Sequence, residues 1–171
     1  PPRSTLARPR RQRQMCIRDR NADVQIVLAD PMGSALHSWV KTGEATMSKG
    51  PSITEGIGNS RVTDNLAGTE VDDAIQVTDQ EMVTMVYQEL LSEGWFFGSS
   101  TGINLCAAVK LAEQLGPGHR IVTILCDTGH KYQSRLFNEE FLAEKGLKPW
   151  QPQRPLKTGA RFSTKALAAS L

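Results

Sequence analysis

A carboxylate, a hydroxyl and a glycine stand together in the last third of the chain, as Asp127, Thr128 and Gly129. They follow residues 121–126, an apolar and β-branched run that predicts a strand buried on both faces. Ligands of open α/β sheets bind beyond the carboxyl ends of the strands, so these side chains are well sited to hydrogen-bond a cofactor ring. The alternative is a simple strand-to-helix loop, in which Gly129 supplies a positive φ and Thr128 satisfies backbone donors.

Two further turn-forming stretches precede this one. Residues 98–104 read GSSTGIN and open a helical pattern, so Ser99 or Ser100 is a good N-cap and the helix start would attract an anion. Plain capping is the favoured explanation of both serines. Residues 55–58 read EGIG within a long loop, of a length that is more often functional than idle. A dinucleotide fingerprint is excluded, because Arg61 stands where a third glycine is required.

Taken in this order, the three stretches resemble the C-terminal half of cysteine synthases, the fold-type II enzymes that use pyridoxal phosphate for β-replacement. The resemblance covers about residues 24–147 and includes the sequence ADPMGS at residues 29–34. It implies pyridoxal 5'-phosphate as the cofactor. It also implies a cytoplasmic enzyme that forms L-cysteine from O-acetylserine and sulfide, as a homodimer when complete.

The resemblance assigns two cofactor-binding residues, Thr128 and Gly56. The residue matching Thr128 hydrogen-bonds the pyridine nitrogen of the cofactor, and a neutral hydroxyl does not hold that nitrogen protonated as a carboxylate would. If Asp127 faced the nitrogen instead, this electronic argument would invert; Thr128 is the residue we assign. The glycine matching Gly56 lines the cofactor, where a side chain would collide with the ring or the substrate.

The surrounding pattern alternates strands and helices. A strand is predicted at residues 24–29 and a short amphipathic piece at 36–40, and three helices are predicted: one from Thr78 to Gly94, one from Ser99 or Ser100 to Gly116, and one over residues 134–145. This order predicts an α/β fold, a partial three-layer doubly wound sheet as in the C-terminal half of fold-type II enzymes.

Two parts of a complete cysteine synthase have no counterpart in this sequence. The Schiff-base lysine and the phosphate-binding loop belong to the family's front half, so we assign no catalytic residue here and expect the segment alone to be inactive. Cystathionine β-synthase-like chemistry is the near alternative. A non-catalytic α/β module is the alternative from a different class.

The two ends differ in composition from the middle. Residues 1–20 hold seven Arg and one Asp, and within them MCIRDR at residues 15–20 looks like the in-frame translation of a transposase adapter used in sequencing. We therefore expect residues 1–20 to be a non-native or disordered basic segment and residues 21–147 to be the enzyme-like domain. Residues 148–171 carry five basic side chains, three prolines and no acid, which predicts a disordered or non-native tail.

Charge and cysteines exclude several other classes. Residues 21–144 hold seven Lys and Arg against seventeen acids, which argues against nucleic acid as a partner. The three cysteines show no metal-ligand spacing and no secreted framework, so no metal site is predicted and Cys126 is expected to be a small buried side chain. His130 is expected to be an exposed loop residue. No apolar run is long enough to cross a membrane, and a membrane is not predicted as a partner.

Overall fold

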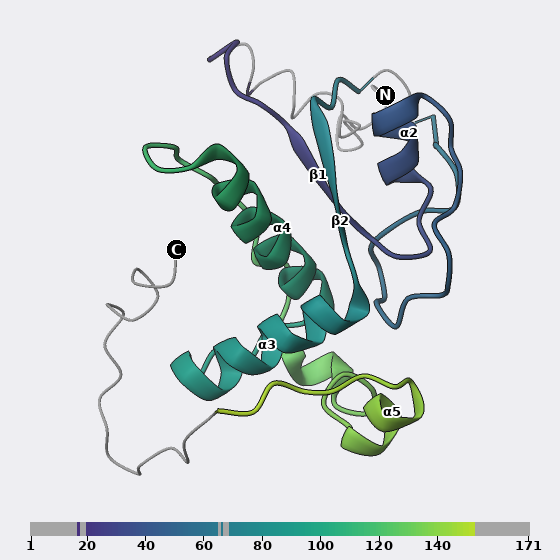
Figure 1. Ribbon diagram of the computed structural model, residues 1–171, viewed down its shortest axis with the longest axis vertical. Coiled ribbons are helices and arrows are strands. Elements are labelled where there is room, and N and C mark those ends of the chain that lie inside the picture. Colours follow the sequence, from purple (N-terminus) through teal and green to yellow (C-terminus); the bar gives the residue numbers. More distant parts are fainter. Residues whose placement is uncertain (1–16, 18–19, 65, 67–68, 153–171) are drawn as a thin grey trace, which may run out of the picture. The chain divides into compact units, whose positions relative to one another are not determined.

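The computed structural model describes residue 17 and residues 20–64, 66 and 69–152 (Figure 1). The predictions made for residues 1–16 and for the tail beyond residue 152 lie outside this description. The chain divides into two compact units. The first takes in residues up to Gly50 together with Gly58–Gln76, and the second takes in Pro51–Ile57 and the chain from Val77 onward.

The first unit is a strand pair with one short helix. β1 (Val27–Pro31) and β2 (Asp73–Val77) form a two-stranded sheet. The Asp72 N–H donates to the Ile26 carbonyl at 2.9 Å, so the two strands start side by side and run parallel (Figure 1). β1 begins at Val27, three residues after the predicted start at residue 24. β2 was not predicted, because DAIQV is short and offers only a brief alternation of apolar and polar residues.

α2 (Leu36–Thr42) follows β1 and corresponds to the short amphipathic piece predicted from residue 36. Its N-cap, Ala35, has no side chain that can cap, but the buried carboxylate of Asp30 accepts a hydrogen bond from the His37 N–H at 2.8 Å. Burial raises the pKa of Asp30. Gly43 then ends the helix with a φ of 81°.

The second unit is built on two packed helices. α3 (Asp79–Glu93) begins with a capping box between Thr78 and Glu81 and ends at Gly94, as predicted. α4 (Ser99–Leu115) packs against α3 (Figure 1). The contact needs a residue without a side chain, because a Cβ on Gly102 would lie 2.6 Å from Val86 Cγ2. Around it the core is fully buried, with Met82, Val83, Val86 and Ile103 at 0% exposure.

The ends of two predicted helices differ from the prediction. Gly98, not a serine, is the N-cap of α4, so Ser99 and Ser100 lie inside the first turn and Ser99 is buried. The helix predicted over residues 134–145 is shorter. It is preceded by a 3-10 helix, η1 (Gly129–Tyr132), and α5 spans Glu139–Glu144. Asn138 caps α5 by accepting a hydrogen bond from the Phe141 N–H at 3.2 Å, so the helix begins there.

The predicted strand at residues 121–126 is wrong. This segment has no regular secondary structure, the described part of the chain pairs no strand with it, and side chains of α4 bond its backbone instead. Thr101 Oγ1 accepts from the Cys126 N–H, and Asn104 Nδ2 donates to the Ile124 carbonyl, each at 2.9 Å. Without a sheet around it the run is not buried: Val122 is 86% and Ile124 69% exposed. Cys126 is exposed for the same reason, contrary to prediction.

The described residues therefore form a small α/β structure with one parallel strand pair. The three-layer doubly wound sheet stays a proposal, since the described residues do not contain it.

Exposed apolar side chains on a segment that pairs with no strand favour self-association. We expect the chain expressed alone to aggregate or to unfold without a sharp transition. Val122→Thr with Ile124→Thr should raise the fraction of monomer in size-exclusion chromatography while leaving helical circular dichroism unchanged. The matched control is Ile103→Thr, which alters a buried position. It should lower the free energy of unfolding by about 2–3 kcal/mol and so reduce the helical circular dichroism signal. A sharp cooperative thermal transition of monomeric wild-type chain would contradict this expectation.

Candidate cofactor site

The segment around Thr128 is fastened to the start of α4 by a short backbone pairing. The Gly98 N–H donates to the Asp127 carbonyl and the Gly129 N–H donates to the Phe96 carbonyl, both at 3.0 Å. Phe97 and Thr128 form an isolated antiparallel bridge between them. The stretch at residues 98–104 and the one at residues 127–129, which lie far apart in the sequence, thus meet in one place.

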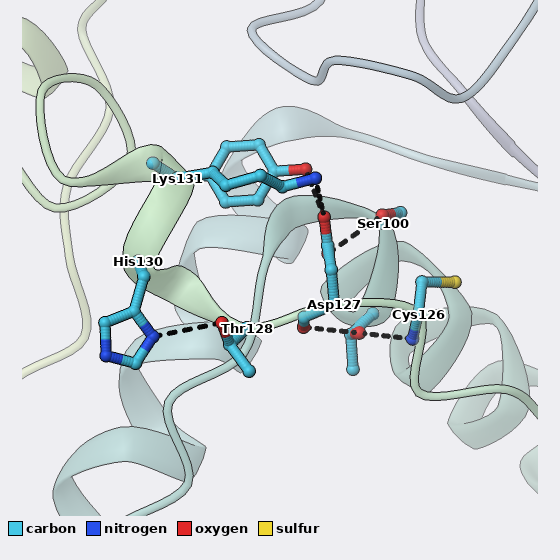
Figure 2. Close-up of polar contacts among 8 residues, drawn as sticks. Ser100, Cys126, Asp127, Thr128, His130 and Lys131 are labelled. Atoms are coloured by element: carbon cyan, nitrogen blue, oxygen red, sulfur yellow. Dashed lines mark hydrogen bonds and ion pairs between the residues drawn. The ribbon is translucent and has the colours of Figure 1, made fainter.

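Thr128 carries an exposed hydroxyl at this junction. It occupies the N-cap position of η1, yet its side chain makes no capping hydrogen bond. Its Oγ1 lies 3.0 Å from His130 Nδ1 (Figure 2). His130 is exposed, as predicted, and its ring packs edge-on against Phe96 with centroids 5.0 Å apart. The hydroxyl is consequently free of the backbone and faces a single side chain among the described residues.

Asp127 is held on the other side of the segment. Tyr132 donates its hydroxyl proton to Asp127 Oδ2 at 2.7 Å, Lys131 Nζ lies 2.9 Å from the same oxygen, and Ser100 donates to Oδ1 at 3.4 Å. In Figure 2 the Asp127 carboxylate points toward Ser100 and Lys131, and the Thr128 hydroxyl points toward His130. Both carboxylate oxygens are engaged, which leaves the Thr128 hydroxyl as the more available group.

These contacts set the charge state of the cluster. Partial burial alone would raise the pKa of Asp127, but the hydrogen bonds from Lys131 and Tyr132 outweigh it and hold that pKa below its usual range. The Asp127 carboxylate in turn raises the pKa of Lys131. Burial, together with the bond to Asp127, raises the pKa of Tyr132. Asp127 is therefore a fixed anion that is neutralised locally by Lys131.

Three partners of Asp127 were not predicted from the sequence, namely Tyr132, Lys131 and Ser100. Lys131 and Tyr132 follow Asp127 by four and five positions, and the 3-10 helix after Thr128 turns them back toward it. Their spacing from Asp127 is therefore the signal that could have revealed them. No local signal could have revealed Ser100, which comes from α4. Gly98 is required for the same contact, because a Cβ there would overlap the Asp127 carboxylate and lie 2.5 Å from Tyr132 Cε2.

Gly56 belongs to the same unit by way of the 51–57 loop. The buried carboxylate of Asp79, at the start of α3, accepts from Ser52 Oγ at 2.5 Å and from the Ile53 N–H at 2.8 Å. Glu55 forms an ion pair with Arg135, at the other end of the loop. Gly56 itself has a φ of 76° and no heavy atom within 4 Å of the place its Cβ would occupy. The position is open, which is compatible with the predicted role beside a ligand.

Other kinds of site receive no support from the described residues. They contain no group of three or more His, Cys, Asp or Glu side chains placed to hold a metal ion. No helix among them is long and apolar enough to cross a membrane. Burial raises the pKa of Cys106 to about 12, so this thiol is not a nucleophile near neutral pH.

A comparison to family models identifies the family of the chain. Residues 11–127 match the model of the pyridoxal-phosphate dependent enzymes, and the chain belongs to that family. Within it, the chain is similar to cysteine synthases. It is 43% identical to cysteine synthase 1 of Emericella nidulans over 129 residues, which are 73% of this chain and 35% of that protein. Identity to cysteine synthase 2 of Schizosaccharomyces pombe is 39%, over 80% of this chain and 38% of that protein.

Two further relatives carry another name. The chain is 32% identical to the O-acetylserine dependent cystathionine beta-synthase of Bacillus subtilis, over 72% of this chain and 38% of that protein. A crystal structure of the Helicobacter pylori protein of that name matches with a TM-score of 0.63 and 24% identity, over 73% of this chain and 38% of the other, which shows a shared fold.

The extent of these matches bears on the site. The chain spans somewhat more than a third of the length of the cysteine synthases it matches. The family match begins at residue 11, inside the segment predicted to be non-native, and ends one residue before Thr128. The site assignment at Thr128 therefore depends on the motif and its geometry.

The residues at the junction fit the family's cofactor. Pyridoxal phosphate is the cofactor of these enzymes, and its ring nitrogen can form one hydrogen bond with a neutral group. The exposed Thr128 hydroxyl is such a group, whereas the Asp127 carboxylate is already bonded by Tyr132 and Lys131. The donor set thus matches the pyridine edge of the cofactor.

The Asp127 cluster predicts a pH dependence of stability. A carboxyl whose pKa is lower in the folded state stabilises the fold above its unfolded pKa of about 3.9, and this contribution is lost as the pH falls through the folded pKa. Asp127→Asn should therefore cost about 1 kcal/mol at pH 7 and progressively less below about pH 4. Urea unfolding of the Val122→Thr, Ile124→Thr protein measures it.

The matched control for this experiment is Glu140→Gln, which removes an exposed carboxylate of α5. It should change the urea midpoint little at any pH. A cost of Asp127→Asn that stays constant from pH 3 to pH 7 would show that the ionised carboxylate does not stabilise the cluster.

Proposed function

We propose that this segment forms the wall of a pyridoxal-phosphate site that meets the pyridine nitrogen, in an enzyme that makes L-cysteine from O-acetylserine and sulfide by β-replacement. The observation that carries the proposal is the exposed hydroxyl of Thr128 beside a carboxylate that is bonded elsewhere. Similarity to proteins named cysteine synthase supports the same activity.

In this proposal the bound cofactor supplies an electron sink that eases loss of the α-proton and of the β-leaving group. Thr128 hydrogen-bonds the ring nitrogen without fixing a positive charge on it. The Tyr132 and Lys131 bonds keep the Asp127 carboxylate away from that nitrogen, so the ring remains a moderate electron sink. Gly56 leaves room beside the ring or the substrate.

The proposed reaction replaces the acetate group of O-acetylserine by hydrosulfide, with no change of oxidation state. The bond between the β-carbon and the oxygen of the acetyl ester breaks, and acetate departs with the bonding electrons. A C–S bond then forms from hydrosulfide to the same carbon, and the proton removed from the α-carbon is returned. The residue that moves this proton is, by family resemblance, the Schiff-base lysine of the front half. Lys131, the lysine beside Thr128, is paired with Asp127 and is not placed in that role.

Cystathionine synthesis is the second candidate, favoured by the 32% identical Bacillus subtilis relative. It differs in the thiol that attacks the β-carbon, homocysteine in place of sulfide. A homodimeric, cytoplasmic enzyme completes the proposal. For the chain as it stands, a non-catalytic α/β module is the alternative from a different class.

Two measurements test the proposal. Pyridoxal phosphate added to the purified chain should produce no Schiff-base absorption, because no lysine in the described part of the chain lies in a sequence context like that of the family's Schiff-base lysine. Joined to the lysine-bearing half of a cysteine synthase, the segment should support cysteine formation from O-acetylserine and sulfide at a higher kcat/KM than cystathionine formation from homocysteine. The reverse preference would favour the second candidate. A hybrid enzyme that folds and binds cofactor but supports neither reaction would overturn the proposal.

A further inference from the structure

The hydrogen bond between Thr128 and His130 decides what the Thr128 hydroxyl can offer to a ligand. A hydroxyl has one proton to donate and lone pairs to accept with. His130 Nδ1, 3.0 Å away, is an acceptor if it is bare and a donor if it carries the ring proton. A bare Nδ1 would take the Thr128 proton. A protonated Nδ1 would bond to the Thr128 oxygen and leave the hydroxyl proton free.

We propose that His130 is a positioning residue whose Nδ1–H donates to Thr128 Oγ1, so that the Thr128 proton is directed to the ring nitrogen of the cofactor. This inference rests on the proposed function, because it takes Thr128 as the partner of that nitrogen. The nitrogen of an unprotonated pyridine can only accept a hydrogen bond. Thr128 must therefore donate to it, and the group behind Thr128 must donate to Thr128.

The imidazole of His130 contacts one aromatic ring. Its ring stands at 80° to the Phe96 ring, with centroids 5.0 Å apart. The Phe96 backbone accepts from the Gly129 N–H, so the ring that contacts His130 and the residue between Thr128 and His130 are fastened together. His130 is itself exposed, and Figure 2 shows its ring directed toward the Thr128 hydroxyl.

The neighbouring polar groups are bonded among themselves, which leaves His130 as the side chain that donates a hydrogen bond to the Thr128 oxygen. Asp127, Lys131 and Tyr132 form one cluster on the far side of the segment. Thr128 does not cap η1, so no backbone N–H competes for its oxygen. Loss of the imidazole would thus free the Thr128 hydroxyl to rotate among its staggered positions.

Three variants of the hybrid holoenzyme separate the possibilities. Thr128→Val removes the hydroxyl while keeping the shape of the side chain. His130→Phe keeps an aromatic ring against Phe96 but removes the hydrogen bond. His130→Asn places an amide where Nδ1 lies, and this amide can donate to Thr128. The readouts are the absorption and emission of the bound cofactor in the resting enzyme, and kcat and KM.

Thr128→Val is expected to shift the cofactor emission. His130→Phe should shift it in the same direction but less, and should lower kcat roughly 3- to 10-fold with KM unchanged, the effect of one misdirected hydrogen bond. His130→Asn should restore most of the wild-type spectrum. A wild-type spectrum for His130→Phe, with a shift in Thr128→Val, would overturn the inference and leave the proposed function standing. No shift in Thr128→Val would overturn the contact of Thr128 with the ring itself.

Nitrogen-15 spectra of the imidazoles supply an independent test. The Nδ1 of His130 should show the chemical shift of a protonated nitrogen in the holoenzyme, and should change on Thr128→Val. The His37 and His119 rings serve as internal controls and should not change. An unprotonated His130 Nδ1 would show that Thr128 donates to His130, which reverses the proposed direction. An His130→Asn enzyme that behaves like His130→Phe would equally overturn the proposal.

Discussion

Replacing Thr128 by Asp in the hybrid enzyme is expected to lower kcat for β-replacement by about 100-fold or more and to change the spectrum of the bound cofactor. A carboxylate facing the ring nitrogen would hold that nitrogen protonated, which alters the electron demand of the ring through the whole reaction. The magnitude is that of losing one preorganised polar group at a reacting centre. The measurement combines steady-state kinetics with absorption spectra of the resting enzyme.

Thr128→Ser is the matched control, because it keeps the hydroxyl and should retain most of kcat. Asp127→Asn is a second control. It neutralises the adjacent carboxylate, which is bonded to Tyr132 and Lys131, and should change the cofactor spectrum much less than a change at Thr128. Unaltered kinetics of Thr128→Asp would remove Thr128 from the site, and a larger effect of Asp127→Asn would point to Asp127 as the partner of the ring nitrogen.

Gly129→Ala should destabilise the second unit by about 2–3 kcal/mol, a large part of the stability of a small unit. A Cβ at Gly129 would lie 2.5 Å from Phe96 Cε2 and 2.6 Å from Phe137 Cε2. These two rings pack on each other with centroids 4.6 Å apart, so neither can move away without disturbing the other. Urea unfolding of the Val122→Thr, Ile124→Thr protein measures the loss.

Gly94→Ala is the control for backbone strain without collision. Gly94 has a φ of 77° and no heavy atom within 4 Å of its would-be Cβ, so this change should cost about 1 kcal/mol. In a double-mutant cycle, Phe96→Leu should relieve part of the Gly129→Ala effect, with a coupling of about 1 kcal/mol or more. Equal losses for the two glycines, or strict additivity in the cycle, would mean that the aromatic rings do not confine Gly129.

Helices α3 and α4 show what local sequence is able to predict. Thr78 and Glu81 close a capping box and Gly94 ends α3, and all of these signals lie within a few residues of the helix they define. The cysteine synthase resemblance was carried by motifs that are likewise contiguous, and the comparisons confirm the family.

Residues 121–126 show where such prediction fails. Their composition is that of a buried strand, but a strand needs a neighbouring strand to pair with, and composition does not say whether the chain supplies one. Here Thr101 and Asn104 bond the segment at single points and Val122 remains exposed. Cys126 was mispredicted as a consequence. β2 was missed for the converse reason, since pairing with β1 stabilises a segment whose own pattern is weak.

By itself, the sequence determined which polar residues stand together at positions 127 and 128, which helices flank them, and the family to which they belong. Only the tertiary structure decided how the two polar residues divide their contacts, because Asp127 is bonded by Ser100 from α4 and by Tyr132 from η1, while Thr128 turns to His130. Adjacent side chains on an extended backbone point to opposite sides. The groups that each side meets come from other elements, and their positions are set by packing that no local pattern encodes.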